Sequence, residues 1–427
     1  MNKFYHELTR EWGSFVSYQS PGPLVRVGSW LKYFAGFFVF FIFVFSAAAR
    51  EFSPPDLISQ SAVIMDAATG TIVYYKNPDE KIPPASLTKL MTMHVAFREI
   101  AAGRASLDET IIPVKESWAI SQPPLSSLMN LAPGQQLSLR ELLLGMAVFS
   151  GNDAAAAVAL RFAPTVREFA EMMTSEAEVL GLGKTRFVDA SGYSEDNMTT
   201  AREFTKFCRI YLEEHPESLG NFHSVREFAY PRAENVAEQY RDNPGTRIQR
   251  NRNTLLGKVD GVDGLKTGFI FESGYNIALT AERNNTRFIV VILGAPAGWG
   301  GDRIRDEEGK KLLEWAFGNY KTLKPRPEAL EPVRVWKGKN NYVNLIFGAP
   351  LDFTVLKERG QNLSWSIEYN DPLICPLPAG SHAGNLTLYD SLGELRRIPL
   401  LTTAEVEKGG FFKRLFDSIR LFFRREK

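Results

Sequence analysis

Residues 83–92 read PPASLTKLMT and hold a serine and a lysine three positions apart, Ser86 and Lys89. The two prolines cannot extend a helix upstream, and apolar periodicity begins at Leu87, so we expect Ser86 at or near a helix N-terminus. Lys89 then lies one turn along the same face, within reach of the serine hydroxyl. A partly desolvated lysine, or one near a second cation, loses its proton more readily and can act as a base. The pair alone is weak evidence, because the same spacing recurs at residues 29–32.

A second motif, SGNDAAAAVAL at residues 150–160, follows one apolar helical run and precedes another. Ser150 and Asn152 offer a hydroxyl and an amide two residues apart, which can relay a proton and hold a substrate amide. Both residue types are also common helix caps, so an ordinary helix–helix turn is the alternative interpretation.

A third motif, GVDGLKTGF at residues 261–269, predicts a strand bounded by glycines. Lys266 and Thr267 provide a cation and a hydroxyl, and Gly268 lets another backbone approach closely. Such a strand suits an extended peptide that ends in a carboxylate and pairs with a sheet edge. The alternative is a solvent-facing lysine in an edge strand.

Other classes of chemistry find no support in the sequence. The five histidines form no His-Glu-x-x-His pair, and no Cys/His cluster has zinc spacing. A Gly-x-Ser-x-Gly motif is also missing, so a histidine-dependent serine hydrolase has no visible nucleophile. The formal net charge of +1 argues against a nucleic-acid-binding protein. Cys208 lies at helical spacing among apolar residues, which predicts a buried core position.

The three motifs occur in the order 86–89, 150–152 and 266–268, which is the signature set of penicillin-binding proteins and class A β-lactamases. Over about residues 60–320 the chain resembles the low-molecular-mass D-alanyl-D-alanine carboxypeptidases. The resemblance lies in AVIMDAATG, PPASLTKLMT, SSLMNLAPGQQLSLRELLLGMAVFSGNDAAAAVA, TRFVDASG, NRNTLLGKVDGVDGLKTGF and GKKLLEWAF.

This resemblance implies a serine peptidase that removes the terminal D-alanine from peptidoglycan pentapeptide stems and is acylated by β-lactams, with no metal and no cofactor. It implies a nucleophile, a general base, a second wall with a proton relay, a substrate strand, an oxyanion hole from two backbone N–H groups, and arginines that orient the substrate carboxylate. By this resemblance Ser86 is the nucleophile, Lys89 is the general base, and Ser150 and Asn152 form the second wall. Lys266, Thr267 and Gly268 line the substrate strand, and the backbone N–H groups of Ser86 and Phe269 form the oxyanion hole. Arg252 and Arg305 orient the carboxylate.

Two positions depart from the family pattern. Phe269 stands where relatives often carry histidine or tyrosine, and Ser191 lies near where some relatives place a histidine. Either difference can change the deacylation rate or the substrate range without removing the nucleophile.

Strand-like and helix-like segments predict an α+β fold: a β-lactamase/DD-peptidase-like sheet with helices, plus a small C-terminal all-β domain. We expect early strands, a central helical block, late strands, a closing helix, a linker and short β runs. The early strands are residues 62–65 and 71–75, and the helical block is residues 86–101 and 137–215. The late strands are residues 264–270, 275–283 and 286–294, and the closing helix is residues 310–318. The linker is residues 321–327, and the short β runs lie within residues 333–400.

The two ends of the chain indicate export and a membrane. Residues 33–45 form an uncharged apolar run with a basic residue before it and Ala47–Ala49 after it, which predicts a signal peptide over residues 1–49, cleaved or kept as an anchor. Residues 406–427 end in a basic amphipathic helix with phenylalanines along its apolar face, which suits an anionic membrane surface. The alternative is a helix packed on its own protein. Between the ends we expect a catalytic domain over residues 50–320 and a β domain over 321–405, on the periplasmic face of the bacterial cytoplasmic membrane.

Three rival functions stay open at this point. A class A β-lactamase needs a glutamate-bearing loop that we do not identify, and normally lacks a second β domain. A DD-endopeptidase that cuts crosslinks uses the same chemistry on a different peptide. A non-catalytic scaffold that binds wall peptides would not need the intact set of motif residues.

Overall fold

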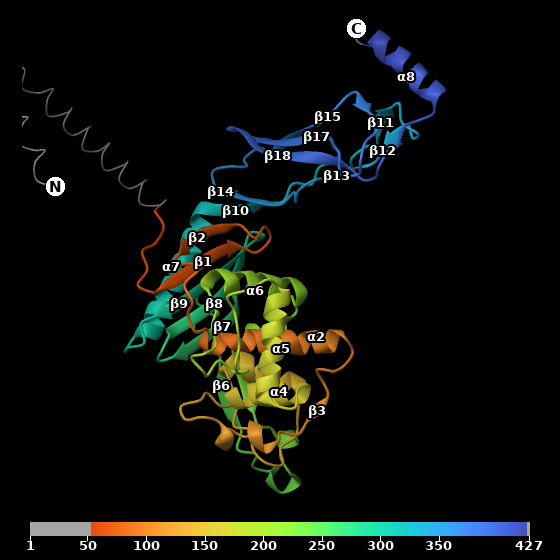
Figure 1. The fold of residues 1–427 in the computed structure, drawn as a ribbon. Helices are drawn as coiled ribbons and strands as arrows, with labels where there is room; N and C mark the ends of the chain where they lie inside the picture. The colour runs from red at the N-terminus through yellow and green to blue at the C-terminus, as the bar shows by residue number, and fades with distance from the viewer. Residues whose placement is uncertain (1–52, 425–427) are drawn as a thin grey trace, which may run out of the picture. The chain divides into compact units, whose positions relative to one another are not determined.

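The computed structural model describes residues 53–424, and its central element is a five-stranded antiparallel sheet in the order β2-β1-β9-β8-β7 (Figure 1). The two earliest strands pair with the latest ones, because β1 lies directly beside β9. Strand β7 therefore lies at one edge of the sheet. The five strands are β1 (Ser61–Asp66), β2 (Ile72–Lys76), β7 (Val262–Ile270), β8 (Gly274–Arg283) and β9 (Thr286–Ala295).

Helices bury both faces of this sheet. Successive side chains of a strand point to opposite faces. Ala62 and Ile64 of β1 accordingly pack in one apolar cluster with α7 (Gly301–Asn319), whereas Val63 packs in the cluster formed by the helical block. Figure 1 shows α7 and α6 on the two sides of the sheet. The predicted helix at 310–318 is thus the second half of a longer helix.

The helical block contains α2 (Lys89–Ala101), α3 (Leu139–Leu144), α4 (Asn152–Phe162), α5 (Val166–Val179) and α6 (Ala201–Glu214). Cys208 lies in α6 and is fully buried, as predicted. Residues 137–215 are mostly helical, as predicted, and residues 180–200 form a loop within this block. Gly181 and Gly192 break the helical pattern there with φ of +68° and +79°.

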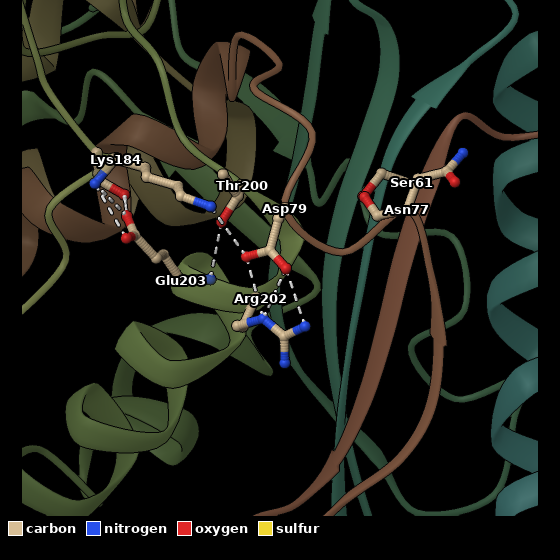
Figure 2. Close-up of polar contacts among 8 residues, drawn as sticks. Ser61, Asn77, Asp79, Lys184, Thr200, Arg202 and Glu203 are labelled. Carbon is tan, nitrogen blue, oxygen red and sulfur yellow. Dashed lines mark hydrogen bonds and ion pairs between the residues drawn. The ribbon is translucent and has the colours of Figure 1, made fainter.

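Polar contacts fasten this loop to the segment that leads into Ser86 (Figure 2). Asp79 accepts hydrogen bonds from Arg202 at 2.9 Å and from Lys184 at 3.2 Å. Thr200 caps α6 by accepting from the backbone N–H of Glu203 at 3.1 Å, and Glu203 in turn accepts from the backbone N–H of Lys184. The loop and the segment before Ser86 are therefore joined at one end of α6.

The C-terminal part is all-β, as predicted, and has its own apolar cluster. The predicted linker at 321–327 is partly wrong, because its first residues belong to a strand, β10, that pairs with β14. The strands are β10 (Tyr320–Leu323), β11 (Val333–Trp336), β12 (Tyr342–Val343), β13 (Leu345–Phe347), β14 (Phe353–Leu356), β15 (Ser364–Tyr369), β16 (Leu373–Ile374), β17 (His382–Asp390) and β18 (Gly393–Thr402).

The chain ends in α8 (Phe411–Arg424). Short antiparallel pairs complete the peptidase part: β3 (Thr110–Ile111) with β4 (Leu137–Ser138), and β5 (Glu227–Tyr230) with β6 (Arg247–Arg250). Within residues 53–424, the structure contains no helix with the length and apolar character needed to cross a bilayer. The predicted signal peptide lies outside these residues.

Candidate active site

Ser86 and Lys89 lie where a 3-10 turn (Ala85–Thr88) runs into α2, as the proline-rich approach predicts. Lys89 Nζ is 3.0 Å from Ser86 Oγ. The same amine donates to Asn152 Oδ1 at 2.8 Å and to the carbonyl of Ser191 at 2.7 Å. The structure therefore joins the first two sequence motifs through one lysine.

Burial changes the acid–base character of this lysine. Lys89 is fully buried, and desolvation lowers its pKa to about 7 although Asp189 and Asp153 oppose the shift. Near neutral pH a large fraction of the amine is thus unprotonated while it lies within hydrogen-bonding distance of the serine. The geometry and the pKa together suit a base that accepts the hydroxyl proton.

Ser150 and Asn152 occupy the turn between the helical segment ending at Phe149 and α4. Ser150 has a left-handed backbone with φ of 68°, and its buried Oγ has no hydrogen-bond partner among the described residues. Asn152 uses its carbonyl for Lys89 and donates from Nδ2 to Ser126 Oγ at 3.1 Å. The turn therefore places the Ser150 hydroxyl, which has no partner among the described residues, beside the Asn152 amide, whose oxygen and nitrogen are both hydrogen-bonded.

Strand β7 carries the third motif at the open edge of the sheet. A Cβ added to Gly268 would lie 2.8 Å from the carbonyl oxygen of Pro84 and 3.1 Å from the amide nitrogen of Ser86. The glycine thus lets β7 touch the turn that holds the serine. Lys266 is buried, and desolvation lowers its pKa well below the usual value, with Lys89 as the next contribution.

The two arginines differ in their surroundings. Arg252 stacks over the ring of Phe149 at 4.4 Å, and burial lowers its pKa. Arg305 is buried and pairs with Asp306 at 2.6 Å.

Phe269, which follows the third motif, packs on Tyr275 with ring centroids 4.3 Å apart.

A cavity of about 1020 Å³ collects most of these groups. Its wall includes eight of the ten site residues predicted from the sequence. These are Ser86, Ser150, Asn152, Thr267, Gly268, Phe269, Arg252 and Arg305. The two lysines, Lys89 and Lys266, are buried beside it.

Sequence reasoning did not identify two carboxylates that shape this cavity. Asp189 accepts from the backbone N–H groups of Ser191 at 2.7 Å and Gly192 at 2.6 Å, which holds the Ser191 carbonyl on Lys89. Asp153 accepts from three consecutive backbone N–H groups, those of residues 129–131. An aspartate followed by small residues is a turn signal in the sequence, but it does not tell what the turn contacts.

Comparison with known proteins gives this architecture a family. Residues 48–297 match the D-alanyl-D-alanine carboxypeptidase family (Peptidase S11), and residues 319–408 match the penicillin-binding protein 5 C-terminal domain. D-alanyl-D-alanine carboxypeptidase DacC of Escherichia coli is 33% identical over 394 residues, which are 90% of this chain and 94% of that protein. A D-alanyl-D-alanine endopeptidase of Pseudomonas aeruginosa is 31% identical over 259 residues, 58% of this chain and 78% of that protein.

Penicillin-binding protein 5 from Haemophilus influenzae has a similar crystal structure, with a TM-score of 0.70 and 29% sequence identity. The alignment covers 83% of this chain and 99% of that one, and so includes both parts of the fold. The protein belongs to the D-alanyl-D-alanine carboxypeptidase family, and it carries the peptidase domain and the penicillin-binding protein 5 C-terminal domain in that order.

Proposed function

We propose that this protein releases the terminal D-alanine from peptidoglycan pentapeptide stems, with Ser86 as the acylated nucleophile. The observation that carries this assignment is the 3.0 Å contact between Ser86 Oγ and the buried amine of Lys89. A serine hydroxyl is a weak nucleophile until a neighbouring base takes its proton. Lys89, with a pKa of about 7, supplies that base without a histidine.

Acylation follows from the groups around the serine. Ser86 Oγ attacks the carbonyl between the two D-alanines while its proton passes to Lys89. The backbone N–H groups of Ser86 and Phe269 stabilise the oxyanion of the tetrahedral intermediate. The free hydroxyl of Ser150 relays a proton to the leaving amine, the C–N bond breaks, and D-alanine departs.

Substrate placement and deacylation use the remaining groups. The peptide pairs with the edge of β7, where Lys266 and Thr267 line the strand. Arg252 and Arg305 orient the terminal carboxylate; Arg252 fits this role better, because no acidic side chain of the described residues pairs with it, whereas Arg305 already pairs with Asp306. Water then attacks the acyl-enzyme ester and returns the proton to Ser86. A β-lactam acylates the same serine and leaves slowly.

The alternatives carry less support. The endopeptidase relative aligns with 58% of this chain, whereas the carboxypeptidase relative aligns with 90%. The longer alignment favours removal of the terminal D-alanine over cleavage of a crosslink. A non-catalytic scaffold has no need of a lysine with a lowered pKa on a serine. A class A β-lactamase is not supported, because the chain matches a carboxypeptidase family and carries a second domain that such β-lactamases normally lack.

Four segments make up the proposed organisation: a signal peptide at 1–49, a catalytic domain at 50–320, a β domain at 321–405 and a membrane-associating segment at 406–427. For the last of these, the support lies in α8. Seven of its eight large apolar side chains are exposed, and the eighth, Leu421, is half-buried. Asp417, on the side opposite the seven, is buried and accepts from the backbone N–H of Lys337 at 2.7 Å. An exposed apolar face beside basic residues fits an anionic lipid surface. The proposed location is the periplasmic face of the bacterial cytoplasmic membrane.

The decisive experiment incubates the full chain with a pentapeptide that ends in D-Ala-D-Ala and measures released D-alanine. Ser86→Ala is the matched control, and a fluorescent penicillin reports acylation in parallel. Release and labelling by the wild type, with neither in the mutant, support reaction and nucleophile together. Labelling without release points to the endopeptidase, which a crosslinked dimeric peptide then tests. Loss of both in the wild type leaves the scaffold.

A further inference from the structure

Two buried histidines meet where α2, α5 and α6 pack together, and none of their neighbours belongs to the wall of the catalytic cavity. His94 lies in α2 and is fully buried, and His215 follows the last residue of α6 and is 6% exposed. Glu214, the last residue of α6, is exposed beside them. The peptidase mechanism uses none of these three side chains.

Their ligand atoms converge on one point. His94 Nδ1 and His215 Nε2 are 3.0 Å apart, and a carboxylate oxygen of Glu214 lies within 4.8 Å of both. Zinc takes nitrogen and carboxylate ligands at about 2.0–2.2 Å, which places the atoms of a tetrahedral set roughly 3.3–3.6 Å apart. Small side-chain rotations bring the three atoms to that spacing. Because Glu214 is exposed, solvent can supply the fourth ligand.

The outer contacts of His94 are those of a metal ligand. Its second ring nitrogen, Nε2, lies 3.3 Å from a carboxylate oxygen of Glu176, which also pairs with Arg98. Metal-ligating histidines commonly donate their other ring N–H to a carboxylate, which fixes the tautomer and raises the basicity of the ligating nitrogen. Here that arrangement leaves Nδ1, the nitrogen facing His215, free of a proton.

Charge and burial favour a cation at this point. Both imidazoles are buried among aromatic side chains, with the rings of His94 and Phe207 5.6 Å apart between centroids. Arg98 offsets only one of the two nearby carboxylates, Glu176 and Glu214. The aromatic ring of Phe97, 5.0 Å from His215 between centroids, closes one side against water.

We propose that His94, Glu214 and His215 bind a divalent transition metal of the zinc class, separate from the catalytic cavity. The metal would replace the single hydrogen bond between the imidazoles with two coordinate bonds, the proton on His215 Nε2 moving to its Nδ1. It would thereby join the end of α6 to the middle of α2. Because α2 begins at Lys89, the site would stiffen the helix that carries the catalytic base. Its role is structural, and the peptidase reaction requires no metal in it.

The test uses the tag-free full chain, stripped with a chelator and titrated with Zn²⁺ in competition with a chromogenic chelator. Glu214→Gln removes one ligand at an exposed position and so leaves the packing intact. Glu213→Gln is the matched control, because it makes the same charge change one residue away, on a side chain outside the cluster. We expect one equivalent of Zn²⁺ on the wild type and on Glu213→Gln, and binding at least about tenfold weaker in Glu214→Gln.

Thermal unfolding supplies a second readout. Saturating Zn²⁺ should raise the Tm of the wild type and of Glu213→Gln, since a ligand that binds only the folded state stabilises it. His215→Gln, which keeps a polar side chain in place, should lose this shift. Equal Zn²⁺ affinity in the wild type and Glu214→Gln, or no Tm shift in the wild type, would overturn the site. Penicillin labelling should be the same in all of these variants, so a failure here is distinct from a failure of the proposed peptidase.

Discussion

The catalytic cavity and helix α8 both depart from the usual distribution of side chains: the cavity has buried charged residues beside it, and α8 has apolar residues exposed to solvent. Around the cavity two lysines, Lys89 and Lys266, are buried at 0% and 1% exposure. Along α8, by contrast, five phenylalanines are each at least 63% exposed. Buried lysines and exposed apolar patches are both uncommon in soluble proteins.

The difference shows two ways in which unfavourable solvation becomes useful. A buried amine loses hydration, its pKa falls, and it becomes a base that reacts inside the protein. An exposed apolar face keeps its unfavourable hydration until an outside surface removes it. The proposed base is therefore provided by the chain alone, whereas the proposed role of α8 needs a surface outside the chain. Four experiments test this contrast, beginning with the largest expected effect.

Lys89→Gln should nearly abolish acylation. Glutamine can still donate to Asn152 and to the Ser191 carbonyl, but it cannot accept the proton of Ser86. Loss of a positioned base costs roughly 10²–10⁴-fold. Stopped-flow or gel measurement of fluorescent penicillin labelling gives the rate, and circular dichroism checks the fold. Labelling at more than about a tenth of the wild-type rate would assign the base elsewhere.

Acidic pH should slow the wild-type enzyme in a defined way. In the proposed mechanism the active form holds a neutral Lys89, and below its pKa of about 7 the amine becomes protonated. We therefore expect kcat/KM to fall about tenfold per pH unit below 7, or about 100-fold by pH 5. The pH profile of D-alanine release measures this. A profile that stays flat down to pH 5 would contradict a base with this pKa.

Gly268→Ala should damage both stability and acylation. The new Cβ would approach backbone atoms of Pro84 and Ser86, which cannot move aside as a flexible side chain can. Overpacking of this kind costs about 1–3 kcal/mol of unfolding free energy. Gly298→Ala is the control, because its Cβ would meet nothing within 4 Å. Chemical denaturation and penicillin labelling compare the two, and equal behaviour would refute the close approach.

Phe416→Ser should weaken membrane association and leave the fold unchanged. The side chain is 64% exposed, so its loss removes little internal packing. Burying a phenylalanine in a lipid interface contributes about 1.5 kcal/mol or more, roughly tenfold in binding. Co-sedimentation with phosphatidylglycerol–phosphatidylethanolamine vesicles measures it. Ile120→Ser, at a 90% exposed position of the peptidase part, serves as the control and should bind like the wild type.

Much of the site could be predicted because its residues are close in sequence. Ser86 and Lys89 share one helical turn, Ser150 and Asn152 share one interhelical turn, and the residues of the third motif share one strand. Local rules for helix starts, turns and alternation therefore placed each motif on its element, and the order of the three motifs marked them as one set. The strand pairs β1–β2 and β8–β9 and the exposed apolar face of α8 followed from local patterns in the same way.

Contacts that depend on distant segments could not be predicted. The Ser191 carbonyl reaches Lys89 only because Asp189 folds its loop and the contacts around Asp79 fasten that loop near Ser86. The sequence indicates a loop around Ser191 but not what that loop contacts, because its partners lie in other segments of the chain. The histidine pair was passed over for a related reason, because His94 and His215 are 121 positions apart.

The sequence by itself determined which chemistry is available: a serine, a lysine within one turn of it, and two further motifs in a fixed order. It also determined that the last helix is amphipathic, because periodicity is a local property of the chain. Only the tertiary structure decided that Lys89 is buried enough to titrate near 7 and that Gly268 lies against Ser86. It also decided that two histidines face each other. Burial and convergence depend on how distant segments pack, and no local pattern records that packing.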